Sequence, residues 1–350
     1  MTTDRLKVGI LGATGAVGQR FIQLLEGHPW FELSALYASE RSAGKPYHEA
    51  VTWRVPVAQP AYAGELVVQT PAPAEDLDLV FSALPSQMAE TMEPLFAEAG
   101  IPVISNASAY RMTSDVPLLI PEVNPEHTAL IATQQAKRGW PGFIATNPNC
   151  AVVGLVLPLK PLHDAFGIES VRVVTLQAKS GAGYPGPPPE IIGDNVLPYI
   201  PGEEEKLQSE PLKLLGALAG DRIEDAHIIL SAQCNRVDVL DGHTASVFIN
   251  FTNRPSVDQA SEALRAYKGI PQTAALPSAP QWPVVVLVDA DRPQPKLDRD
   301  HDQGMAVTVG RLRSDALTDL MFTTLSHNTI RGAAGAAILN AELLKHQGIL

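Results

Sequence analysis

Short apolar runs alternate with helix-like segments through residues 7–105. The apolar runs have the length and composition of buried strands, and the segments between them carry apolar residues at helical spacing. The predicted strands span 7–11, 32–38, 78–84 and 102–105, and the predicted helices span 19–26 and 87–99. Strands that alternate with helices in this way indicate a parallel, doubly wound α/β sheet.

The pattern changes after residue 150. Longer strands are expected at 168–177, 226–232, 244–252, 284–288 and 305–312. The segment 244–252 alternates cleanly between apolar and polar residues, which indicates a strand with one covered face. We therefore expect a second, α+β domain with a largely antiparallel sheet, and an Ala-rich helix at 328–346 that packs back against the first domain. The predicted boundaries are 1–149 and 150–326, with 327–350 completing the first domain.

Glycines join the first predicted strand to its helix, in the order Gly12-Ala-Thr-Gly15-Ala-Val-Gly18. This is a variant of the dinucleotide fingerprint, in the strand–turn–helix context that makes such a motif informative. Gly12 permits the tight turn, Gly15 lets the backbone approach a pyrophosphate, and Gly18 allows close helix packing. We predict a Rossmann-like dinucleotide site, with a purely structural turn as the alternative. The predicted cofactor contacts here are Gly12, Thr14, Gly15, Ala16 and Val17.

The end of the second strand favours NADP over NAD. An NAD site usually carries an acidic residue there for the ribose hydroxyls. Here the chain runs Ser39-Glu-Arg41-Ser42, and Arg41 and Ser42 suit a 2′-phosphate. Glu40 is expected to point away from the nucleotide, and a solvated polar loop is the alternative interpretation. The predicted contacts at this strand end are Ser39, Arg41 and Ser42. Ser82 and Ser86, at the end of the predicted strand 78–84, are further predicted cofactor contacts on the carboxyl edge of the sheet.

The strongest chemical signal is Asn147-Pro-Asn-Cys150, which precedes the apolar run 151–157. Asn and Pro indicate a tight turn, and the apolar run indicates the first turns of a buried helix. Cys150 should therefore lie at a helix N-terminus, where free N–H groups and the helix dipole favour an anion. We expect a thiol of lowered pKa that acts as a nucleophile, beside N–H groups that can hold an oxyanion. A small buried cysteine that merely caps a helix is the alternative.

Composition limits the possible partners and compartment. The chain has 350 residues, 45% of them hydrophobic, which suits two domains with large cores. Its net charge of −12 argues against nucleic acid or an anionic membrane as the main partner, but not against an anionic substrate. Two cysteines make no disulfide framework, and no signal peptide or membrane-length apolar run is present, so we expect a cytoplasmic protein. No Cys or His pair has metal-ligand spacing, so no metal is predicted.

Taken together, these segments resemble aspartate-β-semialdehyde dehydrogenase, of the branch found in archaea and fungi, over essentially the whole chain. The matching stretches are 12–18, 147–150, 177–186 (Gln-Ala-Lys-Ser-Gly-Ala-Gly-Tyr-Pro-Gly), 202–206, 235–243 and 326–335. Asp238 departs from the family's Arg-Val-Pro-Val pattern, which leaves Arg236 and His243 in register. The resemblance implies an NADP-binding domain at 1–149, a catalytic and dimerisation domain at 150–326, and a homodimer or a dimer of dimers.

The resemblance also implies residue roles. Cys150 resembles the nucleophile, His243 the general acid/base, and Gln177 the residue that orients the acyl group. The implied substrate contacts are Arg236 for the carboxylate, Glu203 for the ammonium, Lys206 and Arg111 for the phosphate, and Asn149. A shift from Glu203 to Glu204 or Glu205 stays open, as does a surface salt bridge between Glu203 and Lys206, or an ion pair of Arg236 with Asp238 or Asp241. Further cofactor contacts are implied at Ser180, Gly181 and Asn328. Cys234 is expected to be a packed thiol near the site.

The implied reaction is the NADPH-dependent reduction of L-aspartyl 4-phosphate to L-aspartate 4-semialdehyde and phosphate through a Cys150 thioester. It belongs to the biosynthesis of lysine, threonine, methionine and isoleucine. The alternatives are a malonyl-CoA reductase or an N-acetylglutamyl-phosphate reductase on the same scaffold, neither of which needs an anion for a substrate ammonium. An NADP-binding redox sensor without turnover would explain the glycine motif and a reactive cysteine. It would not explain Arg236, His243 and Gln177 in register with that cysteine.

Overall fold

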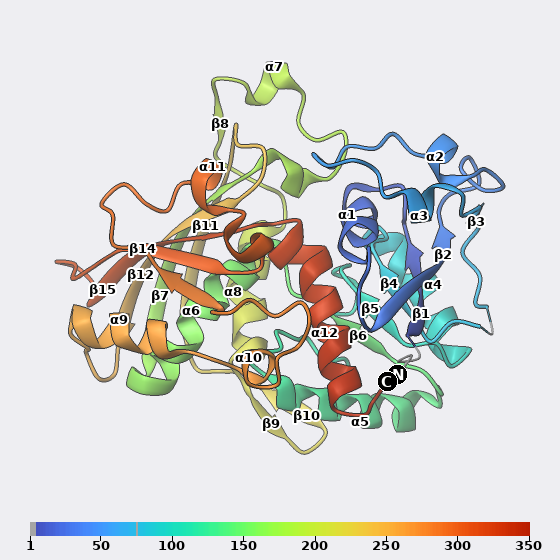
Figure 1. Cartoon of the computed structure of the whole chain (residues 1–350). Helices are drawn as coiled ribbons and strands as arrows, with labels where there is room; N and C mark the ends of the chain where they lie inside the picture. Colours follow the sequence, from blue (N-terminus) through green and yellow to red (C-terminus); the bar gives the residue numbers. More distant parts are fainter. Residues whose placement is uncertain (1–4, 75) are drawn as a thin grey trace.

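The computed structural model describes residues 5–74 and 76–350, and in them two sheets lie on either side of a long C-terminal helix (Figure 1). The first sheet has six strands, all parallel, in the order β3-β2-β1-β4-β5-β6. They are β1 (Leu6–Leu11), β2 (Phe31–Tyr37), β3 (Val68–Gln69), β4 (Leu79–Ser82), β5 (Val103–Ser105) and β6 (Ile144–Thr146). The predicted doubly wound sheet is confirmed. Its strand order reverses between β1 and β4, and ligands bind at the carboxyl ends of strands beside such a switch point.

Helices cover this sheet, and a glycine turn joins β1 to the first of them. The helices of this region are α1 (Ala16–Leu24), α2 (Tyr47–Ala50), α3 (Ala61–Gly64), α4 (Ser86–Glu98), η1 (Pro125–Ala129) and α5 (Leu130–Arg138). Gly12 has a φ of +82°, and a Cβ there would lie 2.8 Å from the Ala83 carbonyl oxygen. A Cβ at Gly18 would lie 2.7 Å from Ala13 Cα. The tight turn and the close packing of α1 predicted from these glycines are therefore present.

The second sheet has seven strands in the order β13-β14-β15-β12-β7-β11-β8. They are β7 (Ile168–Gln177), β8 (Val196–Leu197), β11 (Ile229–Val237), β12 (His243–Phe251), β13 (Val284–Val286), β14 (Val307–Arg313) and β15 (Leu320–Ser326). Only β7 with β11 and β13 with β14 are parallel pairs, so the predicted largely antiparallel sheet is confirmed.

Several details of this region differ from the predictions, among them the short strand β8, which was not predicted. The strand expected at 226–232 lies at β11, because the polar stretch Gln233–Arg236 continues the strand instead of ending it. Strand β15 was not predicted, since its sequence Leu-Met-Phe-Thr-Thr-Leu-Ser shows no strict alternation. The small hairpin β9 (Ala217–Ala219) and β10 (Arg222–Glu224) was also missed.

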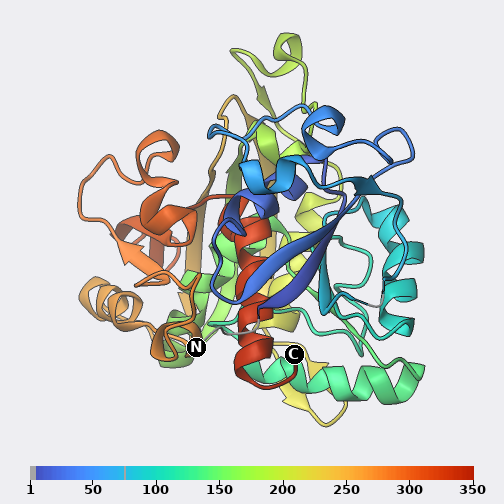
Figure 2. The same cartoon turned by 45° about the vertical axis from the view of Figure 1, so that its right-hand side comes forward.

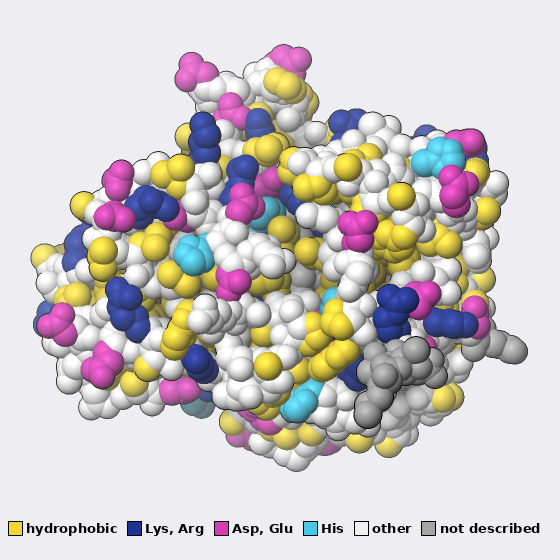
Figure 3. Space-filling view, viewed as in Figure 1, with side chains coloured by type: hydrophobic (Ala, Val, Ile, Leu, Met, Phe, Trp, Pro, Cys, Tyr) yellow, Lys and Arg dark blue, Asp and Glu magenta, His cyan; other side chains and the backbone are white. Residues whose placement is uncertain are grey.

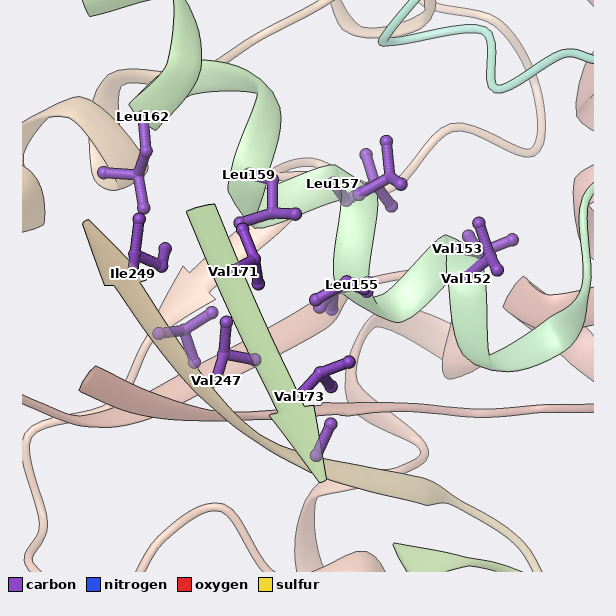
Figure 4. Packing of buried hydrophobic residues seen from close by; sticks show 14 of the residues in the cluster. Val152, Val153, Leu155, Leu157, Leu159, Leu162, Val171, Val173, Val247 and Ile249 are labelled. Atoms are coloured by element: carbon purple, nitrogen blue, oxygen red, sulfur yellow. The ribbon is translucent and has the colours of Figure 1, made fainter. Parts of the chain in front are cut away.

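Helix α6 (Cys150–Phe166) forms the core of the second region. Its apolar residues, including Val152, Leu155 and Leu159, share one buried cluster with Val173 of β7 and Val247 of β12 (Figure 4). The other helices here are η2 (Lys179–Ala182), α7 (Pro189–Ile192), α8 (Glu203–Leu214), α9 (Val257–Ala266), α10 (Ile270–Thr273), α11 (Pro295–Asp298) and η3 (His301–Gly304). Burial of these apolar residues fixes the position of α6 and therefore of Cys150 at its N-terminus.

The C-terminal helix lies between the two sheets, as both views show (Figures 1 and 2). It begins with a π turn, η4 (Ile330–Ala334), and continues as α12 (Gly335–His346), so it starts two residues later than the predicted 328–346. Ala337 and Ile338 share a buried cluster with Val8 of β1. The domain boundaries proposed from the sequence stay predictions.

The surface is mixed in charge. On the face shown in Figure 3, basic and acidic side chains are interspersed, and neither sign forms a continuous patch. Among the helices of the described residues, none has both the length and the apolar composition to cross a membrane.

Candidate active site

Cys150 is the first residue of α6 and borders a cavity of about 560 Å³. The Asn149 side chain caps this helix, because its Oδ1 accepts the Ala151 N–H at 2.9 Å. The helix start predicted for Cys150 is therefore present. The predicted site residues that line this cavity are Ala16, Val17, Ser86, Arg111, Asn149, Cys150, Ser180, Gly181, Glu203, Lys206 and Asn328. The cavity thus joins predicted cofactor contacts to predicted substrate contacts.

His243 is hydrogen-bonded to the Cys150 thiol. Its Nε2 lies 3.2 Å from Cys150 Sγ, and its Nδ1 accepts the Ala178 N–H at 3.0 Å. Because Nδ1 accepts a bond, the proton of the neutral ring lies on Nε2 and points at the sulfur. Burial, the Arg236 charge and His327 lower the pKa of His243 to about 3. The ring is therefore neutral at physiological pH and acts as a donor toward Cys150.

The thiol itself corrects a sequence-based expectation. Burial, and after it the Glu203 carboxylate, raise the pKa of Cys150 to about 12, although Arg111, Arg236 and Lys206 act in the opposite direction. The lowered pKa expected from the helix N-terminus is therefore wrong for the ligand-free chain. Desolvation and a nearby anion both disfavour the thiolate, and together they outweigh the three nearby cations.

Glu203 is the acidic residue of the cavity. Its carboxylate accepts bonds from Asn149 Nδ2 at 3.0 Å, Gln177 Nε2 at 3.2 Å and Lys206 Nζ at 2.9 Å. Burial acts to raise its pKa, but these partners more than offset it, and the pKa is lowered. The adjacent Glu204 instead accepts the Cys234 N–H, and Glu205 is exposed. Of the three glutamates, only Glu203 therefore reaches the cavity.

Because Glu203 is only 8% exposed, its bond with Lys206 is not the solvated surface salt bridge considered above. Gln177 is buried and contacts this same carboxylate, while Cys234 is fully buried away from the cavity wall. Burial raises the pKa of Cys234 to about 11, in keeping with the packed thiol expected there.

Arg236 is buried beside His243 and donates from Nη1 to the Ala178 carbonyl at 2.8 Å. The ion pairs considered from the sequence do not form, because Asp238 pairs with Lys179 at 2.5 Å and Asp241 lies 3.6 Å from Arg20. Its guanidinium therefore keeps donors available for a ligand carboxylate.

Gly181 covers both Arg236 and His243. A Cβ at Gly181 would lie 2.7 Å from Arg236 Nη1 and 2.9 Å from His243 Nε2. Only a glycine at position 181 therefore lets this loop approach the two side chains so closely. On the other side of the thiol, a Cβ at Gly332 of η4 would lie 2.7 Å from Cys150 Cβ.

Arg111 reaches the cavity from the loop that follows β5. Its Nη1 donates to Glu210 Oε1 at 3.0 Å and its Nη2 to the Asn106 carbonyl at 2.6 Å. Glu210 also accepts the Asn149 N–H at 2.6 Å. The structure thus brings Arg111 and Lys206 to the same cavity as Cys150, as expected for a phosphate site.

The cofactor side is built mainly from backbone. Gly15 precedes α1, and no side chain caps that helix, so its first N–H groups suit a pyrophosphate. Ser39, Glu40 and Arg41 are exposed beyond the end of β2, and Ser42 is partly buried. The residues present therefore fit a dinucleotide with a further phosphate near Arg41, and NADP would be held there by the glycine turn and this loop.

Four other predicted contacts lie around the carboxyl edge of the first sheet. Ser86 Oγ bonds Ser108 Oγ at 2.6 Å on the cavity wall. Asn328 Nδ2 donates to Ser180 Oγ, and Asn328 Oδ1 accepts the Gly242 N–H, both at 2.8 Å. Ser82 is fully buried, so its side chain does not reach the cavity, which the neighbouring Ala83 and Leu84 line instead.

Comparison with known proteins agrees with this geometry. Two family models match, "Semialdehyde dehydrogenase, NAD binding domain" over residues 7–131 and "Semialdehyde dehydrogenase, dimerisation domain" over residues 159–331. An aspartate-semialdehyde dehydrogenase of Archaeoglobus fulgidus is 54% identical over 347 residues, which cover 99% of this chain and 100% of that protein. This chain belongs to the aspartate-semialdehyde dehydrogenase family.

A solved family structure supports the same assignment. The aspartate-semialdehyde dehydrogenase of Candida albicans, solved with NADP, is 45% identical, with a TM-score of 0.91 over 99% of this chain and 100% of that chain. The Vibrio cholerae aspartate semialdehyde dehydrogenase II is 28% identical, with a TM-score of 0.78 over 98% of this chain and 99% of that chain. The NADP-binding fold predicted for the first region is thus the fold of the family.

Within this member of the aspartate-semialdehyde dehydrogenase family, sequence reasoning missed three features of the site. Glu210 lies seven residues after Glu203, a spacing that places both on one helical face and could have revealed it. The Ala178 N–H that orients His243 and the approach of Gly332 to Cys150 depend on contacts between distant segments. The described residues contain no cluster of His, Cys, Asp or Glu able to hold a metal ion.

Proposed function

We propose that this chain reduces L-aspartyl 4-phosphate to L-aspartate 4-semialdehyde and phosphate with NADPH, a step toward lysine, threonine, methionine and isoleucine. The observation that carries the proposal is the set of charges around one thiol. The Glu203 carboxylate, the Arg236 guanidinium and the pair Arg111 and Lys206 surround Cys150. An aspartyl phosphate carries the complementary ammonium, carboxylate and phosphate groups. Glu203 favours this substrate over malonyl-CoA or an N-acetylated acyl phosphate, which carry no ammonium.

The proposed chemistry begins at the sulfur. Cys150 Sγ forms a bond to the acyl carbon and gives up its proton. The phosphate leaves with the electrons of the broken C–O bond, takes up that proton and is held by Arg111 and Lys206. Arg236 fixes the substrate carboxylate through two parallel bonds, and Gln177 orients the acyl group beside the sulfur. NADPH supplies the hydride that reduces the resulting thioester. The N–H groups at the start of α6 and the Nε2–H of His243 stabilise the negative charge that then develops on oxygen and sulfur.

Thiol activation is proposed to accompany substrate binding. The Glu203 charge contributes to the raised pKa of Cys150, and a substrate ammonium paired with Glu203 would offset that charge. His243, neutral with its one ring proton on Nε2, keeps that proton and donates a hydrogen bond to the sulfur and to the developing oxyanion. Collapse of the reduced adduct to the aldehyde releases the thiolate, which takes up a proton from solvent. The raised pKa of the free thiol would protect it from adventitious oxidants between turnovers.

The test follows reduced nicotinamide by its absorbance, with aspartate semialdehyde, NADP and inorganic phosphate present. Turnover that requires phosphate and is lost in Cys150→Ala supports the proposal. Cys234→Ala is the matched control, because that thiol is fully buried and does not line the cavity. Turnover with malonyl-CoA or N-acetylglutamate semialdehyde but not with aspartate semialdehyde would instead assign the substrate to one of the alternatives.

We also propose that the enzyme is a homodimer or a dimer of dimers. The face of the second sheet away from α6 carries exposed apolar side chains, including Leu176 at 42% and Ile229 at 76% exposed. Such a face is suited to cover by a second copy. Sedimentation analysis distinguishes the two assemblies, and a monomer at micromolar concentration would contradict both. The cytoplasmic location stays a prediction.

A further inference from the structure

Helix α8 carries four charged residues on one face. Glu203, Lys206, Glu210 and Lys213 follow one another at intervals of three, four and three residues, a spacing that aligns side chains along a helix. The first two border the cavity. Glu210 and Lys213 are only 2% and 4% exposed and take no part in the proposed chemistry. Burial of a charge is costly unless it is paired, so the partners of these two residues indicate what they are for.

Glu210 joins two segments of the site. One carboxylate oxygen accepts Arg111 Nη1 at 3.0 Å, and the other accepts the Asn149 N–H at 2.6 Å. Arg111 belongs to the loop after β5, and Asn149 caps the helix that begins at Cys150. A single carboxylate therefore fixes the predicted phosphate ligand relative to the thiol.

The Lys213 side chain binds the backbone of the same loop. Its Nζ donates to the carbonyls of Arg111, Thr113 and Val116 at 2.7, 2.8 and 2.8 Å. All three donors of the ammonium are thus used on one short segment. Because Lys213 lies on the helix that also carries Glu210, α8 grips Arg111 at both its guanidinium and its backbone.

We propose that Glu210 is a positioning residue for the phosphate group, acting through Arg111, and that Lys213 fixes the loop that carries Arg111. This inference rests on the proposed function. The Arg111 guanidinium is bound at Nη1 by Glu210 and at Nη2 by the Asn106 carbonyl, so it cannot rotate freely. A preoriented ligand spares the entropy of ordering a long side chain at each binding event. The Glu210 charge alone would repel phosphate, but both of its oxygens are already engaged, so orientation outweighs repulsion.

The first test is Glu210→Gln, with Glu205→Gln as the control on the exposed side of the same helix. Glutamine keeps an acceptor for the Asn149 N–H but loses the charge-assisted bond to Arg111. We expect the KM for inorganic phosphate to rise about tenfold to a hundredfold, as for loss of a hydrogen bond to a charged group. The KM values for semialdehyde and NADP should stay unchanged. A fall in the phosphate KM, or an equal rise in all three values, would overturn the inference.

A double variant tests whether Glu210 acts through Arg111. If it does, adding Glu210→Gln to Arg111→Ala should not raise the phosphate KM further, because the second change has nothing left to orient and removes an unpaired negative charge. A further rise in the phosphate KM of the double variant would contradict the proposal. Lys213→Met, which keeps the apolar stem, should speed hydrogen exchange over 111–116 and raise the phosphate KM, and it provides the test if Glu210→Gln does not fold.

The outcomes separate this inference from the function on which it rests. If the unsubstituted protein shows no phosphate-dependent turnover, both fail. If it shows such turnover and Glu210→Gln leaves the phosphate KM unchanged, only the role of Glu210 fails.

Discussion

The two halves of the cavity are built in different ways. On the substrate side, charged groups are buried and bonded to one another before any substrate arrives, as Glu203 is to Asn149, Gln177 and Lys206. On the cofactor side, the glycine turn offers backbone N–H groups, and Arg41 stands exposed at a strand end. The substrate half is thus rigid and specific, whereas the cofactor half relies on local backbone shape. Substitutions on the substrate side should therefore reduce activity far more than substitutions on the cofactor side.

The largest effect is expected at the thiol. Cys150→Ser should lower kcat by at least about 10⁴-fold, because a hydroxyl is a much weaker nucleophile than a thiolate and nothing nearby removes its proton. Steady-state rates with phosphate, NADP and semialdehyde measure this loss. NADP binding, followed by quenching of protein fluorescence, should be retained, and loss of both would point to a folding defect.

Arg236→Lys should come next, with a loss of about a hundredfold in kcat/KM for the semialdehyde. Lysine keeps the charge but cannot form the two parallel bonds of a guanidinium with a carboxylate. The KM for NADP serves as the internal control and should not change. Activity close to that of the unsubstituted enzyme would show that charge alone suffices at this position.

On the cofactor side, Arg41→Ala should weaken NADP relative to NAD by about tenfold in kcat/KM, as expected for the loss of one partly solvated ion pair with the 2′-phosphate. The comparison with Glu40→Gln, its exposed neighbour, separates a specific contact from a general change in charge. An unchanged preference would mean that the 2′-phosphate lies away from this loop.

A further prediction concerns the reactivity of the free Cys150 thiol, without substrate. With a pKa raised to about 12, the thiolate fraction of Cys150 is small at neutral pH and increases with pH. Alkylation by iodoacetamide should therefore accelerate about tenfold per unit from pH 6 to 9 without a plateau. A plateau below pH 8 would show that the pKa of Cys150 is lowered, as first expected from its position at a helix N-terminus.

Glu203→Gln sharpens the same comparison. Removal of the carboxylate takes away a cause of the raised pKa of Cys150, so alkylation of the free enzyme should become several-fold faster while turnover falls. Glu205→Gln, on the exposed side of the same helix, is the control and should change neither the alkylation rate nor the turnover. Slower alkylation would show that Glu203 does not act on the thiol.

The sequence predicted best what is encoded locally. The glycine turn, the start of α6 at Cys150 and the alternating strand β12 each depend on a few consecutive residues. The thiol pKa could not be predicted, because burial and Glu203, both fixed by the fold, dominate it. Ser82 shows the same limit, since its position at a strand end was correct but the direction of its side chain depends on packing. The resemblance supplied His243 and Arg236, whose partner Ala178 lies on another segment.

The approach of Gly332 to Cys150 has a consequence for biogenesis. The π turn that holds Gly332 follows every strand of both sheets in chain order, and Asn147 Nδ2 also donates to the Ala333 carbonyl, at 3.1 Å. During synthesis on the ribosome, the cysteine therefore emerges long before the segment that packs beside it. A nascent chain that already contains every strand of both sheets still lacks this wall of the reaction centre until residues 330–334 are added, so catalytic competence requires that segment.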